Sequence, residues 1–235
     1  MLLPLFRVKI FTVALRIGAL VLLTTCCYQP ATAQGLLGER YVDATFGMSR
    51  PSDDALRQIS SWAVGGGLSL NVPLQDRLDL EISTNIMSFD GTAVLPGPML
   101  VGFDSDLFEI GTSLNWHFRP GCRIDPFIGA GVGYQSQKLE VTNGFVVVRA
   151  NSDEIIYRLK AGFEITLTEQ IAVRTSVSTG DAFDDASFKS AVSDNVFLSS
   201  DLIWWIDDSW FTRLGIGSNF DDTDVQLEFS LGRRF

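Results

Sequence analysis

The stretch DVQLEFSLGRRF, residues 224–235, decides the fold. In steps of two, one set of its side chains is largely apolar: Val225, Leu227, Phe229, Leu231, Arg233 and Phe235. The intervening set, from Gln226 to Arg234, is polar, small or charged. Successive side chains of a β-strand point to opposite faces, so the pattern predicts a strand with one apolar face. Termini of soluble domains usually fray in water, whereas a strand ending on Phe235 suits a barrel that closes in lipid.

The same period of two recurs from Arg40 onward and predicts an all-β chain. Long and short connections alternate along most of it, as in an antiparallel up-and-down transmembrane β-barrel, and strands of roughly 9–13 residues suit a tilted crossing of the bilayer. We expect ten strands, with eight as the alternative. Their predicted ranges are Arg40–Ser49, Trp62–Val72, Leu78–Phe89, Asp106–Phe118, Phe127–Gln137, Asp153–Leu167, Ile171–Thr179, Asn195–Ile206, Trp210–Ser218 and Asp224–Phe235.

Residues 1–33 are predicted to be a cleaved secretory signal peptide, which leaves 34–235 as the barrel domain. Basic residues precede an apolar stretch, Ile17–Leu23, and Ala31-Thr32-Ala33 supplies small residues for cleavage. A lipidated Cys26 is the alternative, although Thr25 is a poor residue before a lipidated cysteine. After cleavage Cys122 is the one remaining cysteine, so no intramolecular disulfide is expected.

The charge balance argues against nucleic acid as a partner. The chain carries 28 acidic and 18 basic side chains, and three of the basic ones lie in the predicted leader, which leaves 28 against 15. Contacts to phosphates require a basic surface, and this one is acidic.

The segment PFIGAGVGY, residues 126–134, resembles the glycine-rich strand of small outer-membrane β-barrel proteins of the OmpA type. Phe235 and the apolar residues in step with it are similar to the C-terminal signal by which such proteins engage the barrel-assembly machinery. Arg233 departs from that signal, but a long side chain at the rim can reach water. The resemblance implies the outer membrane of a Gram-negative cell envelope, with membrane lipid and the assembly machinery as partners.

In a barrel within lipid, the apolar residues face the acyl chains and the polar ones face the lumen. A soluble lipocalin-like ligand-binding barrel is the alternative, because it has the same alternation turned inside out. We expect the membrane arrangement, in which no charge lies at mid-depth on the lipid face. The charged residues then expected to face the lumen are Asp43, Asp79, Glu81, Glu109, Arg158, Lys160, Glu164, Arg174, Asp201, Arg213 and Glu228.

No residue pattern points to catalysis, a cofactor or a metal ion. His117 lies near the predicted periplasmic end with no evident Ser or Asp partner, so we interpret it as a structural lumen residue. The glycines of 65–67 and 129–133 lie within strands and precede no helix, so they do not form a phosphate loop. Two acidic loops lack the spacing of a calcium-binding loop and are interpreted as solvated: Asp181, Asp184 and Asp185, and Asp221, Asp222 and Asp224.

The expected function is therefore a structural or surface-interaction role in the outer membrane, without enzymatic activity. Ten strands lie between small barrels filled by side chains and the 16–18-stranded porins that enclose a channel. We expect charged side chains to plug this lumen. A narrow channel for small solutes or ions is the alternative.

Overall fold

The computed structural model describes residues 35–50, 62–95, 99–143, 145–182, 196–219 and 225–235. The predicted signal peptide, Cys26, and the acidic positions 184, 185, 221, 222 and 224 lie outside these residues. No helix among the described residues is long and apolar enough to cross a membrane. The strands are β1 (Tyr41–Arg50), β2 (Ala63–Gln75), β3 (Leu78–Leu95), β4 (Met99–His117), β5 (Ile124–Thr142), β6 (Val147–Thr166), β7 (Ile171–Ala182), β8 (Val196–Trp205), β9 (Trp210–Asn219) and β10 (Val225–Arg234).

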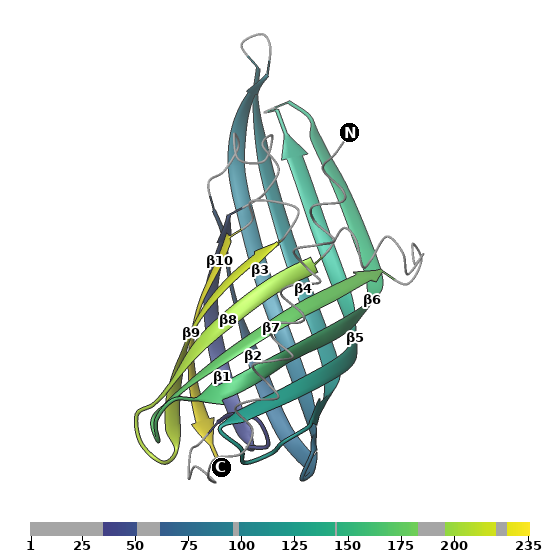
Figure 1. The fold of residues 1–235 in the computed structure, drawn as a ribbon. Coiled ribbons are helices and arrows are strands. Elements are labelled where there is room, and N and C mark those ends of the chain that lie inside the picture. Colours follow the sequence, from purple (N-terminus) through teal and green to yellow (C-terminus); the bar gives the residue numbers. More distant parts are fainter. Residues whose placement is uncertain (1–34, 51–61, 96–98, 144, 183–195, 220–224) are drawn as a thin grey trace, which may run out of the picture. The chain divides into compact units, whose positions relative to one another are not determined.

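The ten strands form one closed antiparallel barrel in which each strand pairs with its neighbours in sequence (Figure 1). β1 and β10 close the barrel, with Tyr41 opposite Arg234 and Arg50 opposite Val225. The backbone N–H of Phe235 continues that ladder by donating to the carbonyl oxygen of Arg40 at 3.1 Å. Closure leaves no unpaired edge around the ring, which backbone groups in hydrocarbon require. The predicted ten-stranded up-and-down barrel is confirmed.

The apolar side chains cover the outside of the barrel, and the polar ones line the lumen. Phe46 on the outer face of β1 is 53% exposed, whereas Asp43 on its inner face is 1% exposed. The same division separates outward Leu68 and Ile128 from inward Asn71 and Glu164. A soluble lipocalin-like barrel would bury the apolar face, so that alternative is wrong.

The chain makes short turns at one end of the barrel, which is the periplasmic end in outer-membrane barrels. Side chains cap two of these turns. The Thr168 hydroxyl oxygen accepts hydrogen bonds from the backbone N–H of Gln170 and Ile171 at 3.2 and 3.0 Å. A carboxylate oxygen of Asp207 accepts from Ser209 and Trp210 at 2.7 and 2.8 Å, and these backbone donors lower the pKa of Asp207. Such local bonds favour tight turns.

At the opposite end, two hairpins extend further than the sequence predicts (Figure 1). The predicted loop between Phe89 and Asp106 is mostly strand, because β3 continues to Leu95 and β4 begins at Met99. β5 and β6 likewise stay paired as far as Thr142 opposite Val147. Few residues therefore separate the paired strands of these two long hairpins. Backbone pairing continues past the bilayer, where side chains need not alternate between apolar and polar.

Candidate functional site: the lumen

A short segment before β1, Gly35–Arg40, lies inside the periplasmic end of the barrel; we call it the strap. Leu36 of the strap is completely buried. Gly38 has a positive φ of 78°, a conformation that glycine adopts without strain, and it turns the chain toward β1. Burial raises the pKa of Glu39, and the carboxylates of Asp79 and Glu164 raise it further against the opposing effect of Arg234.

Leu36 packs into a cluster of large lumen-facing side chains from four strands, which we call the apolar layer. The Tyr41 and Phe211 rings meet edge to face with centroids 5.4 Å apart, and the Trp205 and Phe211 centroids are 5.2 Å apart. The guanidinium of Arg234 lies 5.0 Å from the centre of the Trp205 ring. The layer consists of Leu36, Tyr41, Ala172, Ile203, Trp205 and Phe211, all buried.

His117 lies beside this layer between two carboxylates. Its Nε2 is 3.0 Å from Asp79 and its Nδ1 is 3.3 Å from Asp125. The expectation that His117 has no Asp partner is therefore wrong. Asp125 lies near the start of β5, which pairs with the end of β4. Its other carboxylate oxygen accepts a hydrogen bond from the backbone N–H of Arg119 at 3.0 Å. Both ring nitrogens are engaged and the imidazole is completely buried, as expected of a structural residue.

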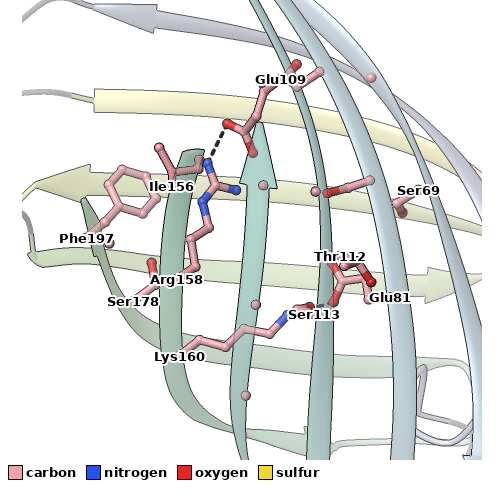
Figure 2. Close-up of a pocket in the computed structure, with 18 of the residues that line it drawn as sticks. Ser69, Glu81, Glu109, Thr112, Ser113, Ile156, Arg158, Lys160, Ser178 and Phe197 are labelled. Atoms are coloured by element: carbon pink, nitrogen blue, oxygen red, sulfur yellow. Dashed lines mark hydrogen bonds and ion pairs between the residues drawn. The ribbon is translucent and has the colours of Figure 1, made fainter. Parts of the chain in front are cut away.

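Four ion pairs link side chains on the inner face of the barrel. Arg174 lies 2.8 Å from Glu164, and Arg213 lies 3.1 Å from Asp43; all four side chains are largely buried. Nearer the outer end, Lys160 lies 2.6 Å from Glu81, and Arg158 lies 2.5 Å from Glu109. Figure 2 shows the side chains of these last two pairs directed toward each other.

The remaining predicted lumen charges also lie on the inner face. Asp201 is opposite Arg174 in the β7–β8 register and opposite Gly215 in the β8–β9 register. Glu228 accepts a hydrogen bond from the Gln226 side chain at 2.6 Å. No group of three His, Cys, Asp or Glu side chains within the described ranges is arranged to hold a metal ion.

The outer half of the lumen is a cavity of about 800 Å³. Small residues form much of its wall, because β5 contributes glycines and β7 contributes serines there. A Cβ on Gly131 would lie 2.5 Å from the Thr112 carbonyl oxygen, so this close strand contact requires glycine. Figure 2 shows Arg158, Lys160, Glu81 and Glu109 around this space with Ile156 and Phe197. Other lining residues include Ser69, Ser83, Ser113, Ser176, Ser178 and Ser199.

Sequence reasoning missed the residues of the apolar layer. Trp205 and Phe211 lie on the polar side of their strands, in step with Asp201 and Arg213. A large aromatic residue among the polar positions of two adjacent strands was the available signal. The sequence around Leu36 gave no such signal, because the strap lacks the alternation of a strand.

Solved structures are similar to this chain at low sequence identity, and no curated protein matches the sequence. The transport unit of the Escherichia coli autotransporter AIDA-I is 9% identical, with 93% of this chain and 96% of that chain covered and a TM-score of 0.54. The translocator domain of Neisseria meningitidis NalP is 8% identical, with 87% and 90% covered and a TM-score of 0.53. The N-terminal barrel domain of Pseudomonas aeruginosa OprF is 14% identical, with 84% and 99% covered and a TM-score of 0.38.

The family comparison agrees with the closed barrel and its apolar outer face. The model described as "Outer membrane protein beta-barrel domain" matches residues 19–230. The chain therefore belongs to this family of outer-membrane β-barrel proteins, as the resemblance to small barrels of this type predicts.

Proposed function

We propose that the protein is a non-catalytic outer-membrane barrel, closed to solutes, that presents its long hairpins as a surface for interaction outside the cell. The closed periplasmic end of the lumen carries this proposal. Leu36 is buried in one cluster with Tyr41, Phe211 and Trp205, and the Arg174–Glu164 and Arg213–Asp43 pairs are also largely buried in the lumen. A solute that entered the outer cavity would meet this barrier.

The hairpin formed by β5 and β6 supports an interaction role. Phe145 at its turn is 98% exposed, and Val146, Val147 and Val148 beside it are also exposed. An exposed ion pair, Arg149 with Glu140, separates this apolar turn from the apolar belt of the barrel. Apolar side chains projecting beyond a charged band suit contact with something other than the protein's own membrane.

An enzymatic role has little support from the same geometry. His117 is completely buried beside the apolar layer, and both of its ring nitrogens are engaged by carboxylates. The lumen acids Glu81 and Glu109 are held in ion pairs rather than placed beside a nucleophile. We therefore propose that the lumen charges stabilise the barrel.

Reconstituted protein tests the closure. Chain refolded from residue 34 onward and inserted in planar bilayers should show no discrete conductance, and proteoliposomes should not swell in small sugars. Steady conductance from the wild-type protein would favour the second candidate function, a narrow channel, for which the polar outer cavity is the supporting observation.

Cells that express the protein test the interaction role. The double substitution Phe145→Ser with Val147→Ser should reduce retention of the cells on octyl-coated beads. The matched control, Asn151→Ala with Ser152→Ala on the same hairpin, should not. Equal retention of all three proteins at equal surface levels would count against an adhesive hairpin.

Membrane lipid and the barrel-assembly machinery are the proposed partners, and Phe235 is the proposed assembly signal. The Phe235 ring is 65% exposed, so it is accessible to a partner, while its backbone N–H is already bonded to Arg40. Deleting Phe235 should lower the amount of heat-modifiable barrel in the outer membrane. Refolding of the same variant in detergent should be almost unchanged.

A further inference from the structure

The strap is held in the lumen by a few polar contacts and one apolar anchor. The Gly38 backbone N–H donates to Asp79 at 2.9 Å, and the Leu37 N–H donates to Glu164 at 3.4 Å. The Asn71 side chain donates to the carbonyl oxygen of Glu39 at 2.8 Å. Leu36 is the anchor, because it is buried in the apolar layer.

The strap can leave its site without disturbing the barrel. Pairing of β1 with both of its neighbours begins at Tyr41, after the strap. Within the strap, the backbone hydrogen bond from Glu39 to Leu36 is local, at 3.3 Å, and the carbonyl oxygen of Arg40, where the strap meets β1, accepts from Phe235 at 3.1 Å. Undocking of residues 35–39 therefore exchanges side-chain contacts and a few hydrogen bonds for water, while the bond between Arg40 and Phe235 and the strand ladder stay intact.

We propose that the strap is a gate, and that the barrel becomes a cation-selective pore when the strap leaves the lumen. The inference rests on the proposed closure of the docked state. Removal of Leu36 takes a completely buried leucine out of the apolar layer, in which the side chain that β7 contributes, Ala172, is small. The path then joins the outer cavity along the ion-paired wall.

The charges along this path favour cations. Four basic side chains, Arg158, Lys160, Arg174 and Arg213, are each paired with an acid. The inner face also carries Asp201 and Glu228, which line the cavity without an ion pair of their own among those four. A lumen with excess carboxylates attracts small cations and repels anions.

Planar-bilayer recordings test the gate with a chain that lacks residues 35–38. The wild-type chain should be silent, and the deletion variant should show discrete openings whose reversal potential in a salt gradient follows the cation. A deletion variant that migrates as a folded barrel but stays silent would overturn the gate and leave the proposed closure standing. A conducting wild type would instead overturn the closure.

Two point variants keep the test independent of the deletion. Leu36→Asp places a charge in the apolar layer and should open the pore, whereas the matched control Leu37→Asp, at the half-buried neighbouring position, should stay closed. Openings that favour anions would refute the selectivity.

A disulfide that tethers the strap to β7 tests whether the pore closes when the strap cannot leave. In a Cys122→Ser background, cysteines at Leu36 and Ala172 join the strap to β7 if they are oxidised. Because Leu36→Cys removes the apolar anchor, the reduced protein should show openings, whereas the oxidised protein should be silent. Equal opening probability before and after reduction would contradict a moving strap.

Discussion

The same strands, with side chains that alternate between lipid and lumen, line both halves of the lumen. The two halves differ in the size of the side chains that point inward. Near the periplasm, Trp205 and Phe211 project inward and pack against the strap, and the Arg174–Glu164 pair beside them is largely buried. In the outer half, the same inner face carries glycine and serine, and Arg158 is half exposed. A ring of ten strands therefore does not by itself set whether the lumen is open. The size of the inward side chains does.

Cysteine labelling should separate the halves most strongly. In a Cys122→Ser background, Ser178→Cys in the outer cavity should react readily with a charged thiol reagent added from outside, because water reaches the cavity. Ala172→Cys in the apolar layer should stay unlabelled until the barrel is denatured. Mass spectrometry after timed exposure measures both, and equal labelling would remove the distinction.

Truncation of an aromatic side chain should cost far more in the dry half. Trp205→Ala should lower the free energy of unfolding by about 3–5 kcal/mol, since it leaves a cavity among buried rings. Phe197→Ala, beside the outer cavity, should cost about 1 kcal/mol or less because water already adjoins its ring. Urea titrations of the refolded barrels check the difference.

The two arginine pairs provide a matched electrostatic comparison. Arg174→Met leaves Glu164 buried without its partner, so we expect a loss of about 3–5 kcal/mol. Arg158→Met leaves Glu109 at the edge of a hydrated cavity and should cost about 1 kcal/mol or less. Similar losses for both variants would show that the outer cavity is as dry as the periplasmic end.

The smallest expected effect concerns pH at the strap. The pKa of Glu39 is raised, chiefly by burial, so the docked strap binds a proton more readily than the free strap. Docking should therefore strengthen as the pH falls from neutral toward the ordinary carboxyl range, and this contribution is lost as the pH rises through the raised pKa. Hydrogen exchange of the Leu37 and Gly38 amides, corrected for intrinsic rates, measures it. Glu39→Gln should remove this part of the pH dependence, and an unchanged profile would assign it to another group.

The alternation of side chains predicts most of the fold because lipid and lumen impose opposite requirements on adjacent residues. It places the β7 and β9 strands to within a few residues, and it places Asp43 and Arg213 on one face. It underestimates the β3–β4 and β5–β6 hairpins, since beyond the bilayer the backbone pairs without that requirement.

The apolar layer and the strap lie beyond what the pattern can predict. Asp125 reaches His117 because the barrel brings the start of β5 beside the end of β4, a relation that local sequence does not encode. The strap is held by tertiary contacts to Asp79 and Glu164, which are distant from it in the sequence.

The seam between β1 and β10 has a consequence for biogenesis. Its partners, such as Val42 with Arg233, are separated by almost the whole barrel sequence, so the ring cannot shut until its final strand has arrived. Until then the exported chain carries amphipathic segments whose outer edges are unsatisfied and prone to pair with other molecules. Any route of assembly therefore has to keep those edges from pairing elsewhere until the final strand is in place.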